Sequence, residues 1–371
     1  MKRHSNVIRN HGRTLLWILW TGFCGLGLAG LPGIVHSTGC GVTLKSGQVL
    51  DGPLPDCNVF PALTIEGPGS FDLNGHTISC ALPEPVDGTP ALKGTGIMVT
   101  GYGARIHHGT IENCDRGVVV GGDGKHLLKK LTVKSPKVTD DVGNIYNNGI
   151  AFEGLSSHNR FVRNKVIQYA GEGFRLGSGN VSANKNVLRL NFVTESANHA
   201  FRVRRGQHNI FLVNVARDNT GPKGGKVQGE GFRSQDRGTK FIANIATGNG
   251  DEGFRLRDVA ATENLLIGNT ARGNGLAPCN LAEEDANPGI AITGLSSSNW
   301  VIDNTVDGNC VGIVVNTDSV RNWVAKNTVL NNALIDVADG NSNCDMNTWW
   351  GNEFNTSAVG PLFNEDPGCI R

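Results

Sequence analysis

A four-residue pattern of chemically active side chains recurs in the middle of the sequence. Glu-Gly-Phe-Arg occurs at 172–175, 230–233 and 252–255, and His-Ala-Phe-Arg occurs at 199–202. Guanidinium groups bind carboxylates and sulfates through paired hydrogen bonds, and a histidine among them can accept a proton. The pattern therefore indicates contact with an anionic ligand, with or without proton transfer.

The reaction that fits this pattern is removal of a proton beside a carboxylate, as in β-elimination or C5 epimerisation of a uronate polysaccharide. Such a reaction needs a cation that neutralises the carboxylate and a base that takes the proton. Arg175, Arg202 and Arg233 are candidates for the cation, and His199 is the candidate base. Tyr169, one repeat earlier, is the candidate partner acid. If the chain is an enzyme, these residues predict a lyase or an epimerase.

A glycoside hydrolase is less consistent with the pattern. Hydrolysis needs two carboxyl groups across the scissile bond, one of them protonated. Each glutamate of the pattern is followed three residues later by an arginine. That arginine would hold the glutamate pKa low and remove the acid.

The same residues allow two non-catalytic interpretations, which the sequence leaves open. The chain can bind an anionic polysaccharide without turnover, or its arginines and glutamates can form a ladder that only stabilises the fold, with His199 merely contacting a glutamate. If a ligand is bound, the expected contact residues are Arg175, Arg202, Arg204, Arg233, Arg255, Arg257, Glu172, Glu230 and Glu252.

The elements that position this pattern form a repeat. The segments 264–274, 299–309 and 322–332 nearly superimpose, with an Asn at each of three fixed positions. Within each unit the apolar residues alternate with period two, as in β-strands, and such short strands bury a core only when the units stack. Aligned on the second Asn, the sequence gives eleven units, anchored at Gly75, Gly109, Leu131, Asn164, Asn191, Asn214, Asn244, Asn269, Asn304, Asn327 and Asn352.

Stacked units of this kind predict an all-β, parallel β-helix of about eleven rungs. Equivalent residues of successive rungs then lie above one another, ~4.8 Å apart, and the recurring Asn amides bond from rung to rung. Phe174, Phe201, Phe232 and Phe254 should point inward and stack, in the position held elsewhere by Ile150. The residues that follow should form an outward column, which reads Met98, Val119, Ala151, Arg175, Arg202, Arg233, Arg255, Ala291 and Val314.

The first 37 residues resemble a secretory signal peptide. A basic start is followed by the apolar stretch 14–31 and by small residues that suit cleavage after Ser37. An uncleaved membrane anchor is the alternative. Cleavage would lower Lys plus Arg from 34 to 30 against 33 Asp plus Glu, because four basic residues lie in the leader. The resulting net charge near −3 gives no global basic field for nucleic acid. Residues 38–371 are then one domain, expected to be a monomer without membrane contact after cleavage.

Eight cysteines follow the leader, and an even number is typical of disulfides in an oxidising compartment. The repeat register stacks Cys80 on Cys114 and places Cys279 and Cys310 in neighbouring units. The other pairs, Cys40 with Cys57 and Cys344 with Cys369, would hold the two ends of the coil. Other connectivities remain open from the sequence alone.

Four long insertions, at about 81–93, 135–146, 220–228 and 275–288, all precede the strand that carries the pattern. Insertions gathered at one edge of a solenoid usually border its binding face. No metal site or cofactor is expected from the residue spacing. The acidic stretch 283–287, and Asp251 with Glu252, are weak candidates for Ca²⁺.

Three features together carry a resemblance to a known group of proteins. They are the cysteine-bounded segments 40–57 and 63–80, the Asn rungs, and the tail with Cys344, Trp349, Trp350 and Cys369. Over about residues 40–371 the chain resembles secreted right-handed parallel β-helix repeat proteins of the pectin-lyase-like superfamily, with a NosD-like rung pattern. The resemblance implies the fold and a secreted or periplasmic location. It implies little about activity, because this fold serves lyases, hydrolases, epimerases and adhesins.

Overall fold

The computed structural model describes residues 34–35, 39–46, 48–81, 94–135, 149–169, 171–223, 226–275, 279, 287–359 and 368–370. All of them belong to one compact unit, Pro32–Arg371. The expected signal peptide lies outside the described residues except for 34–35, so it stays a prediction. In the part of the chain that is described, no helix is long and apolar enough to cross a membrane.

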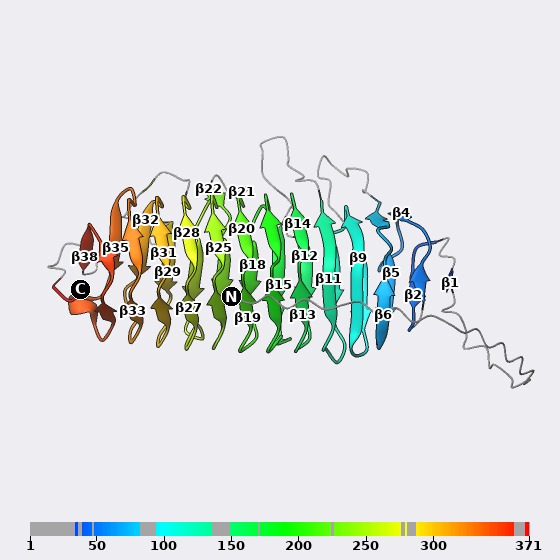
Figure 1. The fold of residues 1–371 in the computed structure, drawn as a ribbon, viewed down its shortest axis with the longest axis horizontal. Helices are drawn as coiled ribbons and strands as arrows, with labels where there is room; N and C mark the ends of the chain where they lie inside the picture. The colour runs from blue at the N-terminus through cyan, green and yellow to red at the C-terminus, as the bar shows by residue number, and fades with distance from the viewer. Residues whose placement is uncertain are drawn as a thin grey trace, which may run out of the picture. The chain divides into compact units, whose positions relative to one another are not determined.

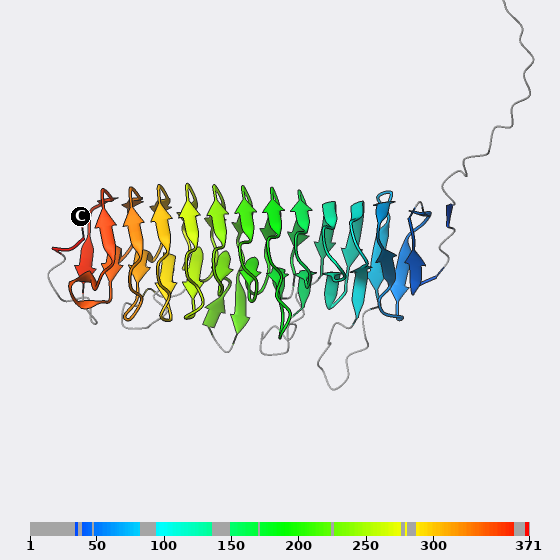
Figure 2. The same ribbon diagram turned by 90° about the horizontal axis from the view of Figure 1, so that it is seen from below.

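The unit is a coil of short parallel strands in which each strand pairs with its counterpart one turn further on (Figures 1 and 2). One side of the coil is a thirteen-stranded sheet. Its strands, in order, are β2 (Val42–Leu44), β5 (Leu63–Glu66), β8 (Thr95–Thr100), β10 (Arg116–Val120), β12 (Ile150–Gly154), β15 (Glu172–Leu176), β18 (Phe201–Val203), β23 (Phe232–Ser234), β26 (Phe254–Arg257), β29 (Pro288–Thr293), β32 (Val311–Val315), β35 (Ile335–Asp339) and β38 (Ser357–Val359).

The remaining sides are formed by strands that lie between these in sequence. They are β4 (Leu54–Cys57), β6 (Gly69–Asp72), β7 (Thr77–Cys80), β9 (Ala104–Glu112), β11 (Leu127–Lys134), β13 (Arg160–Val162), β14 (Lys165–Ile167), β16 (Val187–Arg189), β17 (Phe192–Thr194), β19 (Ile210–Leu212), β20 (Val215–Arg217), β24 (Lys240–Ile242), β25 (Ile245–Thr247), β27 (Leu265–Ile267), β28 (Thr270–Arg272), β30 (Trp300–Ile302), β31 (Thr305–Asp307), β33 (Trp323–Ala325), β34 (Thr328–Leu330), β36 (Thr348–Trp350) and β37 (Glu353–Phe354). Smaller elements are β1 (Ile34–Val35) with β3 (Val49–Leu50), the hairpin of β21 (Gly221–Lys223) and β22 (Lys226–Gln228), and the 3₁₀ turn η1 (Ser342–Cys344).

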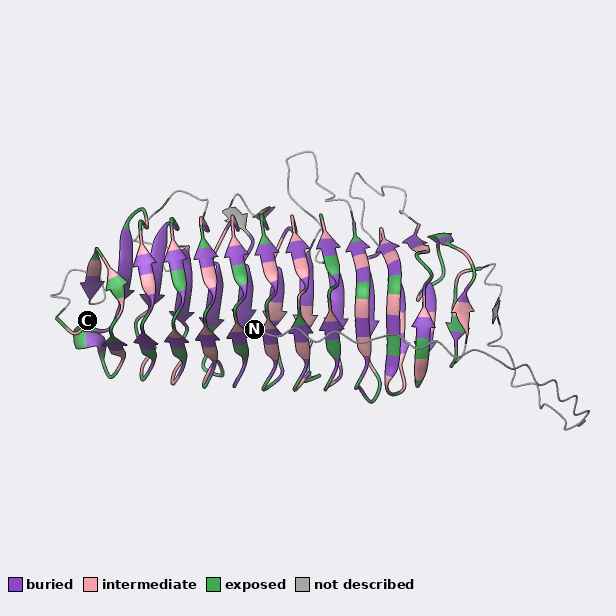
Figure 3. Cartoon of the chain, viewed as in Figure 1, coloured by how far each residue is buried: buried purple, intermediate pink, exposed green. Residues whose placement is uncertain are grey.

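The predicted parallel β-helix is therefore confirmed. The eleven anchor residues fall between the successive strands β5 to β38 of the thirteen-stranded sheet, and β2 with β4 begins one further turn before them. Figure 3 shows the alternation along the strands, where buried and more exposed residues follow one another.

The core contains the expected phenylalanine stack on the inner face of the thirteen-stranded sheet. Phe174, Phe201, Phe232 and Phe254 stack with ring centroids 4.8–5.1 Å apart, and Phe152 continues the stack at 4.5 Å from Phe174. A second set from the facing strands, Phe161, Phe211 and Phe241, meets the first edge-to-face. Offset and edge-to-face pairs of this kind add to the free energy of burial.

Asparagine side chains form continuous ladders at the bends. In the predicted ladder each Asn donates its side-chain N–H to the side-chain carbonyl of the Asn one rung on, from Asn164 to Asn352, at 2.9–3.1 Å. Two further ladders were not expected. One includes Asn264, Asn299, Asn322 and Asn347, and the other Asn219, Asn249, Asn274, Asn309 and Asn332.

All four expected disulfides are present, joining Cys40 to Cys57, Cys80 to Cys114, Cys279 to Cys310, and Cys344 to Cys369. Four disulfides in one chain are typical of an extracytoplasmic protein.

Two parts of the expected register are wrong. The structure pairs Thr77 with Thr110, one residue away from the alignment of Gly75 with Gly109. The structure pairs Phe152 with Phe174 and Glu153 with Arg175, whereas the sequence alignment placed Ile150 and Ala151 there. Alternation of period two makes Ile150 and Phe152 equally suitable for an inward position. The charged part of the column that contains the arginines therefore begins with a carboxylate, that of Glu153.

The described residues that follow the four insertions begin strands at the expected edge. Each one links a strand of another side to the start of β8, β12, β23 or β29, and parallel strands begin at the same edge of a sheet. Most insertion residues lie outside the described residues, and the hairpin β21–β22 belongs to the third insertion.

Candidate functional site

Two neighbouring columns of charged residues lie on the outer face of the thirteen-stranded sheet. The first holds Glu172, His199, Glu230 and Glu252, each two residues before a stacked phenylalanine. The second holds Glu153, Arg175, Arg202, Arg233 and Arg255, each directly after a stacked phenylalanine and paired in register. We call these nine residues the charge cluster. The expected arginine row is confirmed.

The small residue of the pattern lets the chain turn between the two columns. A Cβ atom at Gly173 would lie 2.5 Å from the carbonyl oxygen of Ala200 and 2.8 Å from Cγ1 of Val193. The position therefore points into the coil and has no room for a Cβ atom at Gly173. The residues on either side of the Gly-Phe pair can then both project outward.

Ion pairs connect the cluster from rung to rung. Arg175 Nη2 donates to Glu153 Oε1 at 2.6 Å, and Arg202 Nη1 donates to Glu172 Oε1 at 2.7 Å. Arg202 Nε also donates to Gln235 Oε1 at 2.9 Å.

In the second half of the cluster, Glu230 is the common partner. Its Oε1 accepts from Arg233 Nη1 at 3.2 Å and from Arg255 Nη1 at 3.3 Å, and its Oε2 lies 3.3 Å from Nδ1 of His199. Arg255 Nη1 also lies 2.8 Å from Glu252 Oε1. Four guanidinium groups are thus interleaved with four carboxyl groups.

The cluster is much less exposed than an open basic face would be. The side-chain exposure is 12% for Arg175, 16% for Arg202, 11% for Arg233 and 6% for Arg255. The glutamates are buried further, with Glu252 and Glu153 at 1%. Arg175 and Arg202 are therefore the guanidinium groups that reach solvent most.

His199 is neutral at physiological pH. Burial lowers its pKa to about 4, and the nearby guanidinium groups of Arg233 and Arg202 act in the same direction against the carboxylates of Glu230 and Glu172. Glu230 is ionised. Burial alone would raise its pKa, but His199, Arg233 and Arg255 outweigh that effect and hold it at about 2.

Glu252 behaves differently from the sequence expectation. Burial and the neighbouring Asp251 carboxylate raise the pKa of Glu252 well above its usual range, despite the ion pair with Arg255. The expectation that each arginine keeps its glutamate acidic is thus supported for Glu230 and wrong for Glu252. The sequence spacing alone could not show how deeply Glu252 is buried.

Tyr169 lies away from the cluster. Its side chain is fully buried in the core, and its hydroxyl donates to the carbonyl oxygen of Cys114 at 2.7 Å. Burial raises its pKa well above the usual value. This position does not support the expected role as partner acid. Arg204 and Arg257, by contrast, are exposed at the border of the cluster.

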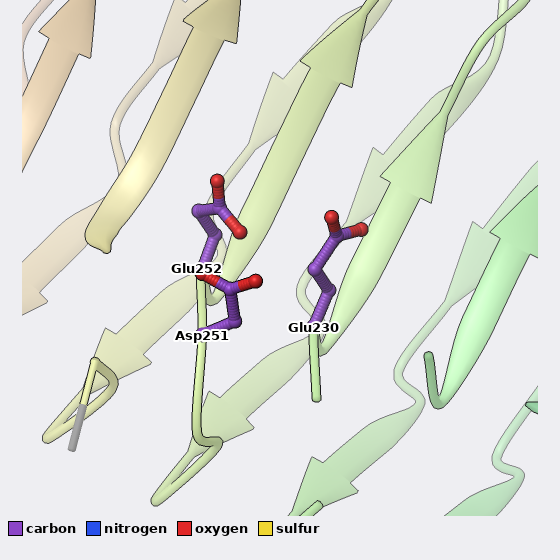
Figure 4. Close-up of side chains that lie close together, drawn as sticks. All are labelled: Glu230, Asp251 and Glu252. Carbon is purple, nitrogen blue, oxygen red and sulfur yellow. The ribbon is translucent and has the colours of Figure 1, made fainter. Parts of the chain in front are cut away.

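Glu230, Asp251 and Glu252 form a group of three carboxyl groups whose oxygens lie within 4.8 Å of one another. Figure 4 shows Glu230 at the start of one strand and Asp251 with Glu252 at the start of the next. The weak Ca²⁺ candidate at Asp251 and Glu252 thus has a third carboxylate, although the Arg255 guanidinium already contacts Glu230 and Glu252. The other calcium candidate, 283–287, lies outside the described residues except for Asn287.

Sequence reasoning missed Glu153, Gln235 and Arg116 as members or neighbours of the cluster. Arg116 Nη1 lies 3.3 Å from Glu153 Oε2, one rung before the cluster begins. A signal for Glu153 was present, because it follows Phe152 as Arg175 follows Phe174.

Comparison with known proteins identifies the fold. Residues 181–334 match the family described as right handed beta helix region. No curated protein matches the chain. Among solved structures, the A-module of the mannuronan C-5 epimerase AlgE6 of Azotobacter vinelandii is similar, with a TM-score of 0.61 and 15% identity over 86% of this chain and 87% of that chain.

The catalytic domain of a GH87 alpha-1,3-glucanase, solved in complex with tetrasaccharides, is also similar. The TM-score is 0.52, with 12% identity over 80% of this chain and 61% of that chain. At these identities the likeness shows the fold, a right-handed parallel β-helix of the pectin-lyase-like kind. The chain is thus a distant structural neighbour of polysaccharide-acting enzymes.

Proposed function

We propose that the chain is a secreted or periplasmic protein that binds an anionic polysaccharide at the charge cluster and removes a proton from it, as a uronate C5 epimerase or a polysaccharide lyase. One observation carries the proposal. In the same two columns, the rungs that follow the cluster hold apolar residues, such as Val311 with Val314 and Ile335 with Ala338. The fold therefore does not need charge at these positions.

Stability alone is a poor reason for the charges. Buried ion pairs seldom stabilise a protein more than apolar side chains of similar size, because removing ions from water costs as much as their attraction returns. Five successive rungs nevertheless keep them. A site that must hold a polyanion and a proton acceptor accounts for this cost.

The geometry suggests how the residues would share the work. Glu230 beside Nδ1 of His199 favours the tautomer with the proton on Nδ1, which leaves Nε2 as the acceptor. Arg233 Nη1 lies 3.4 Å from Nε2, so a uronate carboxylate held by Arg233 would bring its neighbouring C–H bond close to that nitrogen. Arg202 and Arg175, the most exposed of the four guanidinium groups, would hold adjacent carboxylates of the chain.

The fold likeness supports the reaction class without proving it, since an epimerase acting on mannuronan has the same fold. Epimerisation and elimination share the first step, loss of the proton α to the carboxylate. They differ in the second step, which is return of a proton in the one and loss of the leaving group in the other. The proposal covers both.

The test is to incubate the mature protein with alginate, pectate or a glycosaminoglycan in D₂O. Deuterium at C5 without chain cleavage indicates an epimerase, and an unsaturated, ultraviolet-absorbing product indicates a lyase. His199→Gln should reduce the rate by roughly 10²–10⁴-fold, whereas His158→Gln, at an exposed histidine, should not. Retention of the polymer without exchange or product would instead show a non-catalytic binder, and no retention would leave a structural solenoid.

One observation favours a second candidate, a glycoside hydrolase. Glu230 is ionised, whereas burial and the Asp251 carboxylate raise the pKa of Glu252 on the next rung, and paired carboxyl groups with separated pKa values are what hydrolysis uses. Both side chains are almost fully buried, which makes contact with a scissile bond harder. New reducing ends without an unsaturated product, lost in Glu252→Gln, would select this candidate.

A further inference from the structure

Three exposed tryptophans lie on successive rungs of a different sheet. Trp300 in β30 pairs in register with Trp323 in β33, and Trp350 in β36 pairs with Ala325, two residues further along β33. Their exposed fractions are 40%, 43% and 55%. We call these three residues the tryptophan strip. Its rungs directly follow the rung of Arg255.

The fold does not need tryptophan at these positions. In the column of Trp300 and Trp323, earlier rungs carry Arg160, Val187, Ile210, Lys240 and Leu265. Polar and aliphatic residues thus satisfy the same strand position. Three large aromatic side chains that stay partly in water point to a surface that is covered when a ligand binds.

The strip offers both an aromatic surface and unused hydrogen-bond donors. In the described part of the chain, no hydrogen bond involves the indole N–H of Trp300, Trp323 or Trp350, whereas that of the buried Trp349 donates to Asp339 Oδ2 at 2.8 Å. Lys326 Nζ lies 5.3 Å from the centre of the Trp350 ring. The edge of the strip is therefore polar.

The surface area of the tryptophan strip distinguishes between a protein partner and a linear ligand. Three rungs at ~4.8 Å and about three strand residues at ~3.3 Å cover on the order of 150 Å². A stable protein–protein interface needs about 800 Å² on each partner. A second copy of the chain is therefore a poor fit, and a narrow linear ligand fits well.

We infer that the tryptophan strip binds a pyranose polysaccharide, with sugar rings lying against the indole faces. The axial C–H bonds of a pyranose ring are weakly positive and suit the negative face of an aromatic ring, while the sugar hydroxyls accept from indole N–H groups. The rung repeat matches the repeat of a sugar chain in scale. The inference rests on the proposed function only for the class of ligand, because the strip and the charge cluster lie on different sheets.

The experiment is affinity electrophoresis of the full chain through gels that contain alginate, pectate or a neutral β-1,4-glucan, at low salt and at roughly 0.5 M salt, where charge contacts are screened. The variant is Trp300→Leu/Trp323→Leu/Trp350→Leu, which keeps an apolar surface and removes the rings. We expect wild-type retention that survives salt, and roughly tenfold or greater loss of affinity in the variant.

The matched control is Val259→Ala, at a valine that is 69% exposed outside the strip, and it should be retained like wild type. Thermal unfolding of each variant checks that the coil is intact. Arg202→Ala/Arg233→Ala should keep the salt-resistant retention. If that variant also keeps full exchange activity, the proposed function fails while this inference stands.

Three results would overturn the inference. One is salt-resistant retention that the leucine variant keeps, because a merely apolar contact would suffice. Another is no salt-resistant retention of the wild type in any gel. The third is a wild-type dimer, or wild-type binding to phosphatidylcholine vesicles, that the variant loses while its glycan retention is unchanged.

Discussion

The asparagine ladder and the charge cluster are both rows of buried polar side chains that repeat from rung to rung, but they differ in extent. The ladder from Asn164 to Asn352 is unbroken, and each amide bonds to the next. The charge cluster spans only the rungs from Glu153 to Arg255. Apolar residues follow it in both columns, and Val119 and Met98 precede it in the arginine column.

This difference in extent distinguishes side chains that every rung of the coil requires from side chains that only the rungs of the charge cluster require. From Asn164 to Asn352 every rung bends at the same position and leaves backbone groups that an amide can satisfy, so the ladder continues through all of these rungs. Nothing in the geometry of a rung requires an arginine or a glutamate. A polar row that starts and stops inside a uniform coil therefore marks a function.

The largest effect should come from breaking the ladder. In Asn244→Leu, the backbone and side-chain N–H groups of Asn214 lose the carbonyl that accepts both at 2.9 and 3.0 Å, and the carbonyl of Phe211 loses a donor. Because these groups stay buried, the free energy of unfolding should fall by about 4–5 kcal/mol. Denaturant unfolding measures this loss.

The control for the ladder is Asn180→Ala, at an exposed asparagine, which should change stability by less than about 0.5 kcal/mol. A ladder variant that unfolds like wild type would show that the amides follow the repeat without stabilising it, and the comparison would fail.

The second prediction concerns pH, which should change the stability contributed by the charge cluster and not that contributed by the asparagine ladder. His199 has a pKa of about 4 in the folded protein and roughly 6.5 when unfolded. Between these values the unfolded chain binds more protons, so this residue makes stability rise with pH from about 4 to about 6.5, by up to about 3 kcal/mol. His199→Gln should show a shallower rise in pH-dependent denaturant unfolding.

In the same experiment Asn244→Leu should keep the wild-type slope, because the ladder contains no titrating group. A His199→Gln slope equal to or steeper than wild type would mean that His199 is not buried in its neutral form.

The fold was predictable because a coil repeats its register. Once Asn164 and Asn191 are aligned, Phe174 must lie beside Phe201 and Arg175 beside Arg202. The alignment of the two earlier units in the same way brings Cys80 within reach of Cys114. The alignment was wrong at Ala151, in place of Glu153, where the alternation of period two allows two alignments and no Asn or Arg marks the strand. It was also one residue out at Gly75, where no Asn marks the bend.

The protonation and burial of the site residues could not be predicted from the sequence as well as the fold could. Whether Glu252 is ionised depends on burial and on Asp251, and both outweigh the Arg255 that the spacing places nearby. Tyr169 was chosen for its place in the sequence, but its side chain points into the core, where its hydroxyl meets backbone carbonyls. Register follows from the sequence repeat, whereas solvation depends on neighbours from several rungs.

A third prediction, with a smaller effect, tests whether the phenylalanine stack beneath the charge cluster holds its side chains in position. Phe201 directly precedes Arg202 and points into the core. Phe211, in the second phenylalanine set, faces Phe201 across the core, and the two ring centroids are 6.1 Å apart. Phe201→Leu and Phe211→Leu should each lower the free energy of unfolding by about 1–2 kcal/mol. We expect only Phe201→Leu to slow deuterium exchange, since it alone alters the strand that carries Arg202. Equal effects on exchange would mean that the stack sets overall stability and not the position of the cluster.

The smallest effect on stability should come from making one charged rung resemble an uncharged one. Glu252→Val/Arg255→Val copies the Val311 and Val314 of β32, and an apolar pair in place of a buried ion pair should change the free energy of unfolding by no more than about 1 kcal/mol. Arg255→Val alone should lower the free energy of unfolding further, since Glu230 and Glu252 then lose a shared cation, and a double-mutant cycle measures the difference.

The same double variant should also lose activity. Activity on a uronate polymer should fall at least roughly tenfold, because Arg255 helps keep Glu230 ionised beside His199. Full activity of the double variant would show that Glu252 and Arg255 are not needed for function. A loss of more than about 3 kcal/mol in the free energy of unfolding would show that they stabilise the fold, as the asparagine ladder does.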